Sequence, residues 1–223
     1  YRFSLGYAQN NGNIEGTSFN RLNTRFNSDI KLTDEFKIMF DIVYAQTGHK
    51  VAFDGIDRMR SPYYLALTKS PLYAPYQFNS SGSMSGRLAD VDELNIGNPL
   101  ALTGSDNLPD MDKYRFTLNL RPSYQITKRL EVAALFGFSY DKENENLFIP
   151  DEGITDEPLY NDMGEIYATA LNEVRNLMAR QTSLSVDGHV KWDILKDYRH
   201  DLSASLGGRF YNTYYRYTYG QGF

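Results

Sequence analysis

The sequence of 223 residues predicts an all-β fold: a segment of an antiparallel transmembrane β-barrel, with about seven strands and long outer loops that contain short helices. Three observations predict it. Apolar and polar residues alternate along extended segments, connections alternate between short turns and long loops, and aromatic residues gather near the strand ends. No apolar run approaches the roughly 18 residues that a membrane-spanning helix needs, which excludes a helical membrane protein.

The alternation is clearest in residues 36–44, where even positions are apolar or aromatic while Lys37 and Asp41 occupy odd positions. Such alternation places successive side chains on opposite faces of a strand. Segments of about ten alternating residues suit strands that cross a bilayer at a tilt. The same pattern predicts strands over 114–126, 130–140, 184–194 and 202–210, and weaker alternation predicts strands over 1–9 and 19–31.

The predicted connections differ sharply in length. Short turns are expected over 32–35, 127–129 and 195–199, and long loops over about 47–113 and 143–182. Loops this long are unusual in a compact domain, and short turns on one side with long loops on the other are typical of outer-membrane barrels. Within the loops, residues 61–68 predict a short helix with Pro62 in its first turn. Residues 167–180 predict an amphipathic helix with Leu171, Val174, Leu177 and Met178 on one face.

Aromatic residues lie where the interfaces of a membrane barrel need them, because a tyrosine ring is apolar and its hydroxyl prefers water. The alternative is that they form the rim of a soluble sheet. An odd number of strands cannot close a single-chain bacterial barrel, so the chain, which starts inside a strand, is expected to be a piece of a larger wall. The predicted girdle residues are Tyr1, Phe36, Tyr44, Tyr114, Tyr124, Tyr140 and Trp192.

Composition argues against several classes of function. The net charge of -5 disfavours a nucleic-acid binder, and the absence of cysteine excludes disulfides and thiol chemistry. The three histidines lack metal-ligand spacing, and no catalytic motif is present. Carboxylates at Asp106, Asp110 and Asp112 lack an EF-hand pattern, so solvated loop charge is preferred to calcium binding. We expect no enzymatic activity, no cofactor and no metal site.

Two groups of side chains are candidates for contacting a solute. Aromatic faces offer large, rigid contact areas, and arginines on the wet face suit acidic or hydroxyl-rich solutes. Loop packing, an interface girdle and pairing with nearby carboxylates are the alternatives. The candidates are Tyr73, Tyr76 and Phe78 in the first loop, Tyr215 and Tyr217 in the tyrosine-rich segment after 210, and Arg115 and Arg121 on the strand over 114–126.

Several stretches resemble a known family. Residues 19–37, FNRLNTRFNSDIKLTDEFK, resemble a barrel hairpin of SusC/RagA-type TonB-dependent transporters from Bacteroidetes outer membranes. The loop pieces SPLYAPY at 70–76 and NPLA at 98–101 resemble the family's long-loop pattern, and residues 1–16 resemble a strand that enters a short outer loop. The resemblance extends to about Tyr140 and then weakens into general barrel alternation.

The resemblance implies a 22-stranded barrel that holds a plug, with this chain as about a third of the wall. It implies import of oligosaccharides or peptides, with a SusD-like surface lipoprotein as lid and the TonB complex as energy source, in an outer membrane of lipid and lipopolysaccharide. The plug, the TonB box and the closing strand are not found in these residues. A passive porin or surface structural barrel is one rival, and a soluble carbohydrate-binding β-sandwich is another.

Overall fold

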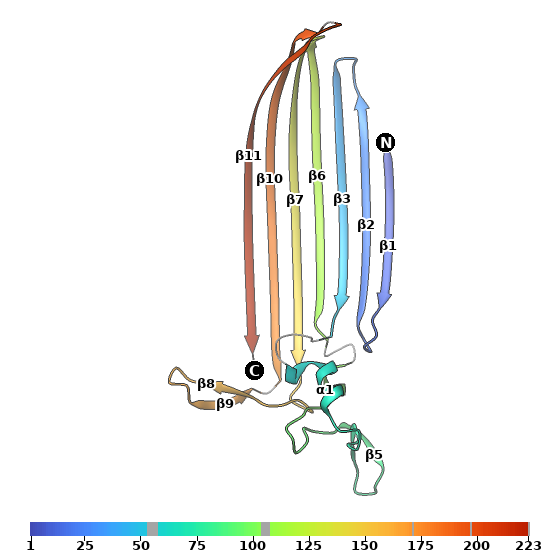
Figure 1. Ribbon diagram of the computed structural model, residues 1–223, viewed down its shortest axis with the longest axis vertical. Helices are drawn as coiled ribbons and strands as arrows, with labels where there is room; N and C mark the ends of the chain where they lie inside the picture. Colours follow the sequence, from blue (N-terminus) through green and yellow to red (C-terminus); the bar gives the residue numbers. More distant parts are fainter. Residues whose placement is uncertain (53–57, 104–107, 171, 197, 223) are drawn as a thin grey trace.

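The computed structural model describes residues 1–52, 58–103, 108–170, 172–196 and 198–222. Its main feature is one antiparallel sheet whose strands follow one another as β1-β2-β3-β6-β7-β10-β11 (Figure 1). The bounds confirm an all-β fold with strands at all seven predicted places. They are β1 (Arg2–Asn11), β2 (Ser18–Lys31), β3 (Phe36–Lys50), β6 (Asp110–Thr127), β7 (Leu130–Ile149), β10 (Glu173–Lys196) and β11 (Asp201–Gly222).

The register places apolar side chains from all seven strands on the same face of this sheet. Ile42 pairs with Leu118, Leu118 with Phe138, and Phe138 with Leu184. Much of this face is open: Leu206 is 80% exposed and Phe210 is 57% exposed. The described residues include no second sheet of comparable size; two small two-stranded sheets complete the β structure. A β-sandwich would cover this face with such a sheet, and within the described residues no sheet covers it.

The strands extend further into both long connections than the sequence predicts. β3 continues to Lys50 and β6 begins at Asp110, while β7 continues to Ile149 and β10 begins at Glu173. The long connections therefore run over 51–109 and 150–172. They leave the same end of the sheet, opposite the short turns (Figure 1).

The amphipathic helix predicted over 167–180 is wrong. Residues Ile166–Ala170 form β9, which pairs with β8 (Glu157–Tyr160), and β10 occupies the segment from Glu173 onward. Val174 pairs with Phe148 on one side and with Gly222 on the other. An isolated helix of this length is marginal, so hydrogen bonding to two neighbouring strands determines the conformation.

The first long connection contains the predicted short helix. α1 (Pro62–Thr68) begins where expected, with the Ser61 side chain accepting a hydrogen bond from the Tyr64 backbone. Two short 3-10 helices, η1 (Arg58–Arg60) and η2 (Pro99–Leu102), and a small hairpin of β4 (Tyr76–Phe78) and β5 (Met84–Leu88) complete this connection. No helix among the described residues is long and apolar enough to cross a membrane.

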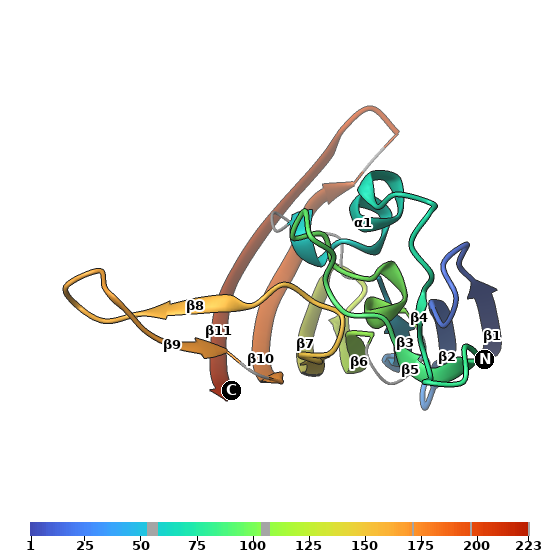
Figure 2. The ribbon, with the colours of Figure 1, turned by 90° about the horizontal axis from the view of Figure 1, so that it is seen from below.

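The buried core of the molecule lies at the loop end of the sheet. Figure 2 shows the long connections gathered over that end. At its centre Asn98, only 1% exposed, donates hydrogen bonds to the Pro75 carbonyl at 2.8 Å and the Ala89 carbonyl at 3.0 Å. The bond to Pro75 joins the two loop pieces, 70–76 and 98–101, that carry the family resemblance. The apolar cluster around them contains Leu65, Ala101, Leu102, Leu147, Ile149 and Ile154.

Candidate functional site

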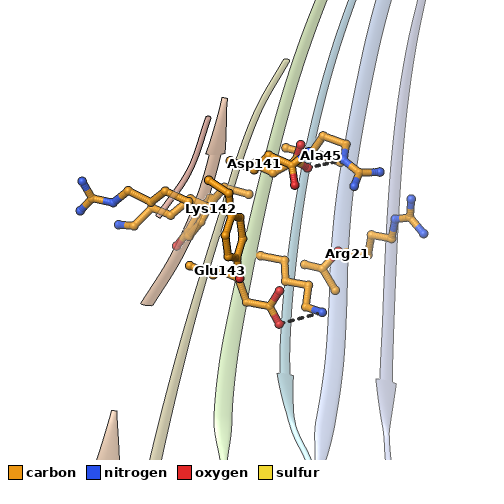
Figure 3. Close-up of a pocket in the computed structure, with 13 residues that line it drawn as sticks. Arg21, Ala45, Asp141, Lys142 and Glu143 are labelled. Atoms are coloured by element: carbon orange, nitrogen blue, oxygen red, sulfur yellow. Dashed lines mark hydrogen bonds and ion pairs between the residues drawn. The ribbon is translucent and has the colours of Figure 1, made fainter. Parts of the chain in front are cut away.

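The polar face of the sheet carries a groove of about 430 Å³ toward its loop end (Figure 3). The strands place odd-numbered residues on this face, since Arg115 pairs with Asp141, Asp141 with Gln181, and Gln181 with Tyr215. Tyr114, Lys142 and Arg180 also border the hollow, although alternation assigns their side chains to the apolar face. The lining residues of the polar face are Arg21, Ala45, Thr47, Lys113, Arg115, Asp141, Glu143, Ala179, Gln181 and Tyr215.

Two cross-strand ion pairs organise the middle of the groove. Arg115 Nε lies 2.5 Å from Asp141 Oδ1, and Lys113 Nζ lies 2.9 Å from Glu143 Oε1 (Figure 3). The Arg115 side chain is 67% exposed, and exposed pairs of this kind contribute about 0 to 1 kcal/mol. Their main effect is therefore to orient donors and acceptors in a wet groove.

Arg21 differs from Arg115 and Lys113 because its hydrogen-bond partner is neutral. Its Nε donates to Asn23 Oδ1 at 2.9 Å, and it makes no ion pair with a carboxylate of the described residues. Figure 3 places it at the β2 side of the groove, away from Asp141 and Glu143. A guanidinium without an ionic partner keeps its donors available for a carboxylate or hydroxyl of a solute.

The two candidate residues of β11 lie on the polar face. Tyr215 is 58% exposed and lines the groove, opposite Gln181. Tyr217 lies one step further along, opposite Ala179, and is not part of the lining. The structure therefore brings Tyr215 and Arg115 to one groove and leaves Tyr217 beside it.

Arg121 lies in a second hollow, nearer the short turns. This hollow of about 360 Å³ also contains Asp41, which accepts from Arg25 Nε at 2.7 Å and from Asn27 at 2.8 Å. Arg115 and Arg121 therefore share a face but belong to different hollows. The remaining lining residues are Asn27, Asp29, Met39, Phe40, Asn119 and Leu135.

The candidate aromatics of the first loop lie away from both hollows. The Tyr73 hydroxyl donates to Glu93 Oε2 at 3.0 Å, and this hydrogen bond, with the charge of Glu93, raises the pKa of Tyr73 above its ordinary value. Lys69 Nζ lies 5.8 Å from the centre of the same ring. Tyr76 and Phe78 bound the small strand β4, where Phe78 is 61% exposed. Tyr73 thus contacts other residues of the loop, whereas the Phe78 side chain is exposed to solvent.

Sequence reasoning missed most of the groove. Alternation predicts the face of the sheet on which Arg21 and Arg115 lie. The pairing of Lys113 with Glu143 depends on the ends of β6 and β7, which the sequence predicts as loop. Among the described residues, no group of three or more His, Cys, Asp or Glu side chains is placed to hold a metal ion. Asp110 and Asp112 belong to β6, and Asp106 lies outside the described residues.

No protein-family model matches the chain, and no curated protein matches it in sequence. Among solved structures, a structure of the RagAB peptide transporter matches with a TM-score of 0.63 at 17% identity, over 99% of this chain and 24% of that one. The RagAB peptide importer in its 'closed-closed' state matches with a TM-score of 0.60 at 18% identity, over the same shares. At this identity the likeness shows the fold: the chain is folded like part of a RagAB chain and spans about a quarter of its length.

Proposed function

We propose that this chain is a non-catalytic stretch of the wall of an outer-membrane, TonB-dependent importer of SusC/RagA type. The observation that carries the proposal is the division of one sheet into two faces. One face is apolar and open across all seven strands, and the other is polar and carries ion pairs and two hollows. A wall between lipid and a wet lumen needs this division.

The height of the apolar face supports a bilayer. On β7 the apolar side chains run from Leu130 to Tyr140, ten residue steps apart. These steps extend ~34 Å along the strand, and a tilt of about 40° reduces the height to ~26 Å. Outer-membrane barrels carry an apolar band of about 25 Å between aromatic girdles, so the height matches.

The open edges of the sheet support a larger barrel. Within the described residues, β1 pairs only with β2, and β11 pairs only with β10. Unpaired backbone groups cost several kcal/mol each in lipid, where no water replaces the missing partner. We therefore infer that further strands complete the wall, as the match to 24% of a RagAB chain suggests.

The solute that best fits the groove is a peptide or an oligosaccharide. Arg21 and the paired groups around Arg115 and Lys113 offer donors and acceptors in a wet setting, and Tyr215 offers an aromatic face. The solved neighbours are described as peptide transporters, which favours peptides for this chain. We further propose a SusD-like lipoprotein lid over the long connections and energisation by the TonB complex through other regions of the transporter.

The test uses the full-length protein in its native membrane. Cells are fractionated, the protein is located, and uptake of a labelled peptide mixture and of a labelled oligosaccharide mixture is measured with and without an intact TonB complex. We expect an outer-membrane location and uptake that requires TonB. Uptake independent of TonB would instead identify a passive porin, and a soluble location would refute the wall.

A further inference from the structure

Three cations stand side by side on the apolar face of the sheet, where the proposed wall meets lipid. Arg180 on β10 pairs in register with Lys142 on β7 and with Arg216 on β11. Figure 3 shows Lys142 directed away from its chain neighbours Asp141 and Glu143, which belong to the groove. Neighbouring strands lie about 4.8 Å apart, so these three residues form a row ~10 Å wide. We call Lys142, Arg180 and Arg216 the basic row.

Among the described residues, no carboxylate forms an ion pair with a member of the basic row. Like charges directly opposite each other on neighbouring strands are destabilising. Arg180 Nη2 lies 3.2 Å from Met178 Sδ, and Arg216 Nη2 donates to the Tyr214 hydroxyl at 3.4 Å. Both partners are neutral, so the positive charge is not balanced.

The residues that surround the basic row confirm this imbalance. On the same face, the next positions toward the loops are Asn144, Met178 and Thr218, and those toward the short turns are Tyr140, Thr182 and Tyr214. Among the described residues of the neighbouring strands, only Asp112, diagonal to Lys142 on β6, brings a carboxylate near one end of the row. Within the described part of the sheet, Arg180 and Arg216, both exposed, have no carboxylate at an adjacent position of this face.

The basic row lies at a definite height. It follows directly after an aromatic layer that contains Tyr44, Phe116, Tyr140 and Tyr214, on the side of the long connections. In a membrane wall, aromatic residues mark the boundary between acyl chains and headgroups. The row therefore stands at the headgroup level of the leaflet on the long-loop side, where phosphate groups of lipids are found.

We propose that the basic row binds the phosphorylated headgroup of a lipid in that leaflet. Arginine presents donors in a fork that matches phosphate oxygens, and three adjacent cations can share one or two phosphate groups. The phosphate supplies the missing counter-charge, while the acyl chains cover the apolar layers below. This site rests on the proposed function, since only a membrane wall brings a lipid to this face.

The test uses the full-length protein purified from outer membranes in a neutral detergent. Its melting temperature is measured during titration with phosphorylated lipid A, with the same glycolipid after removal of its phosphates, and with inorganic phosphate. The wild-type protein is compared with K142Q/R180Q/R216Q and with a control, K31Q/K37Q/K128Q, that removes three charges at the short-turn end. The single variant R180Q provides a milder change should the triple variant fail to fold.

We expect phosphorylated lipid A to raise the melting temperature of the wild-type and control proteins. The apparent affinity is expected to fall about tenfold or more in the triple variant, and less in R180Q. Equal affinity in wild-type and both row variants, or equal binding of the dephosphorylated glycolipid, would overturn the site. Equal stabilisation by inorganic phosphate would overturn the lipid assignment. The proposed function is tested separately by cell fractionation and TonB-dependent uptake, since the titration measures only the binding of lipid to the basic row.

Discussion

Arg60 and Glu173, separated by 113 residues in the chain, form a buried ion pair with Nη1 of Arg60 2.8 Å from Oε2 of Glu173. Their side chains are 7% and 2% exposed. Glu173 also accepts hydrogen bonds from Arg175 and from Gln221, the latter at 2.7 Å. The carboxylate is thus satisfied by three donors and joins η1 of the first long connection to the beginning of β10 and the end of β11.

Removing the carboxylate should release the first long connection from the sheet. Glu173→Gln removes the charge of one partner of this buried ion pair, and losing one partner of a buried pair costs about 3–5 kcal/mol. We expect faster hydrogen exchange over residues 58–66 of the full-length protein. The exposed Glu152→Gln is the control, and unchanged exchange in Glu173→Gln would show that the pair does not hold the loop.

A charge placed on the apolar face should impair membrane assembly. Leu118 lies in the middle layers of that face, whereas its neighbour Thr117 lies on the polar face. An arginine at the bilayer midplane of a barrel costs about 2–4 kcal/mol, so Leu118→Arg should reduce the folded fraction in lipid vesicles and Thr117→Arg should change it little. If both variants assembled equally well, the face would not be in contact with lipid.

Two glycines of the first long connection should respond differently to a methyl group. A Cβ on Gly97 would lie 2.9 Å from the Gly153 carbonyl oxygen, whereas a Cβ on Gly86 would meet nothing within 4 Å. Gly97→Ala should therefore lower the stability of the loop cluster by about 1–3 kcal/mol, the usual cost of overpacking. Protease cleavage of the connection, compared between the two variants, measures this difference; similar cleavage would contradict the packing.

The Arg115–Asp141 pair should contribute little to stability. Because the arginine is largely exposed, a double-mutant cycle with Arg115→Gln and Asp141→Asn should give a coupling of about 1 kcal/mol or less. Denaturant unfolding in lipid provides the four free energies. A coupling well above this range would mean that the groove is drier than its exposure indicates.

Arg21, which makes no ion pair with a carboxylate of the described residues, should affect solute uptake more than the Arg115–Asp141 pair affects stability. We expect Arg21→Gln to reduce uptake of acidic peptides about tenfold or more, since a charged hydrogen bond is worth about 1.5–3 kcal/mol, and to spare uptake of neutral peptides. Arg129→Gln, in the turn between β6 and β7, serves as the control. An equal loss for both peptide classes would indicate a structural role for Arg21.

Features that depend on neighbouring residues in sequence could be predicted. The turn over 32–35 lies between β2 and β3 where alternation placed it, and α1 begins after Ser61 because proline and a capping serine define its start. The helix prediction over 167–180 was wrong because Val174, Leu177 and Met178 also fit the spacing of an amphipathic helix. The strands that make it β lie tens of residues away along the chain.

The groove was harder to predict for the same reason. The face of each arginine follows from alternation, but the partner of each arginine depends on register between strands. Arg115 meets Asp141 only because the turn between β6 and β7 fixes their alignment, with a shift between Gln125 and Thr127. The pairing of Lys113 with Glu143 could not be predicted, because both residues lie near strand ends, whose positions are the least certain part of a prediction from sequence.

The order of strands in the sheet follows their order in the chain, without a crossover. Each interstrand alignment is therefore determined by the two strands themselves and, at the short-turn end, by a brief connection. Lengthening or replacing residues 51–109 or 150–172 would leave every backbone pairing of the seven long strands in place. The alignment of the sheet and the sequence of the two long connections are therefore structurally separable, so we expect that the connections can change while the strands keep their register.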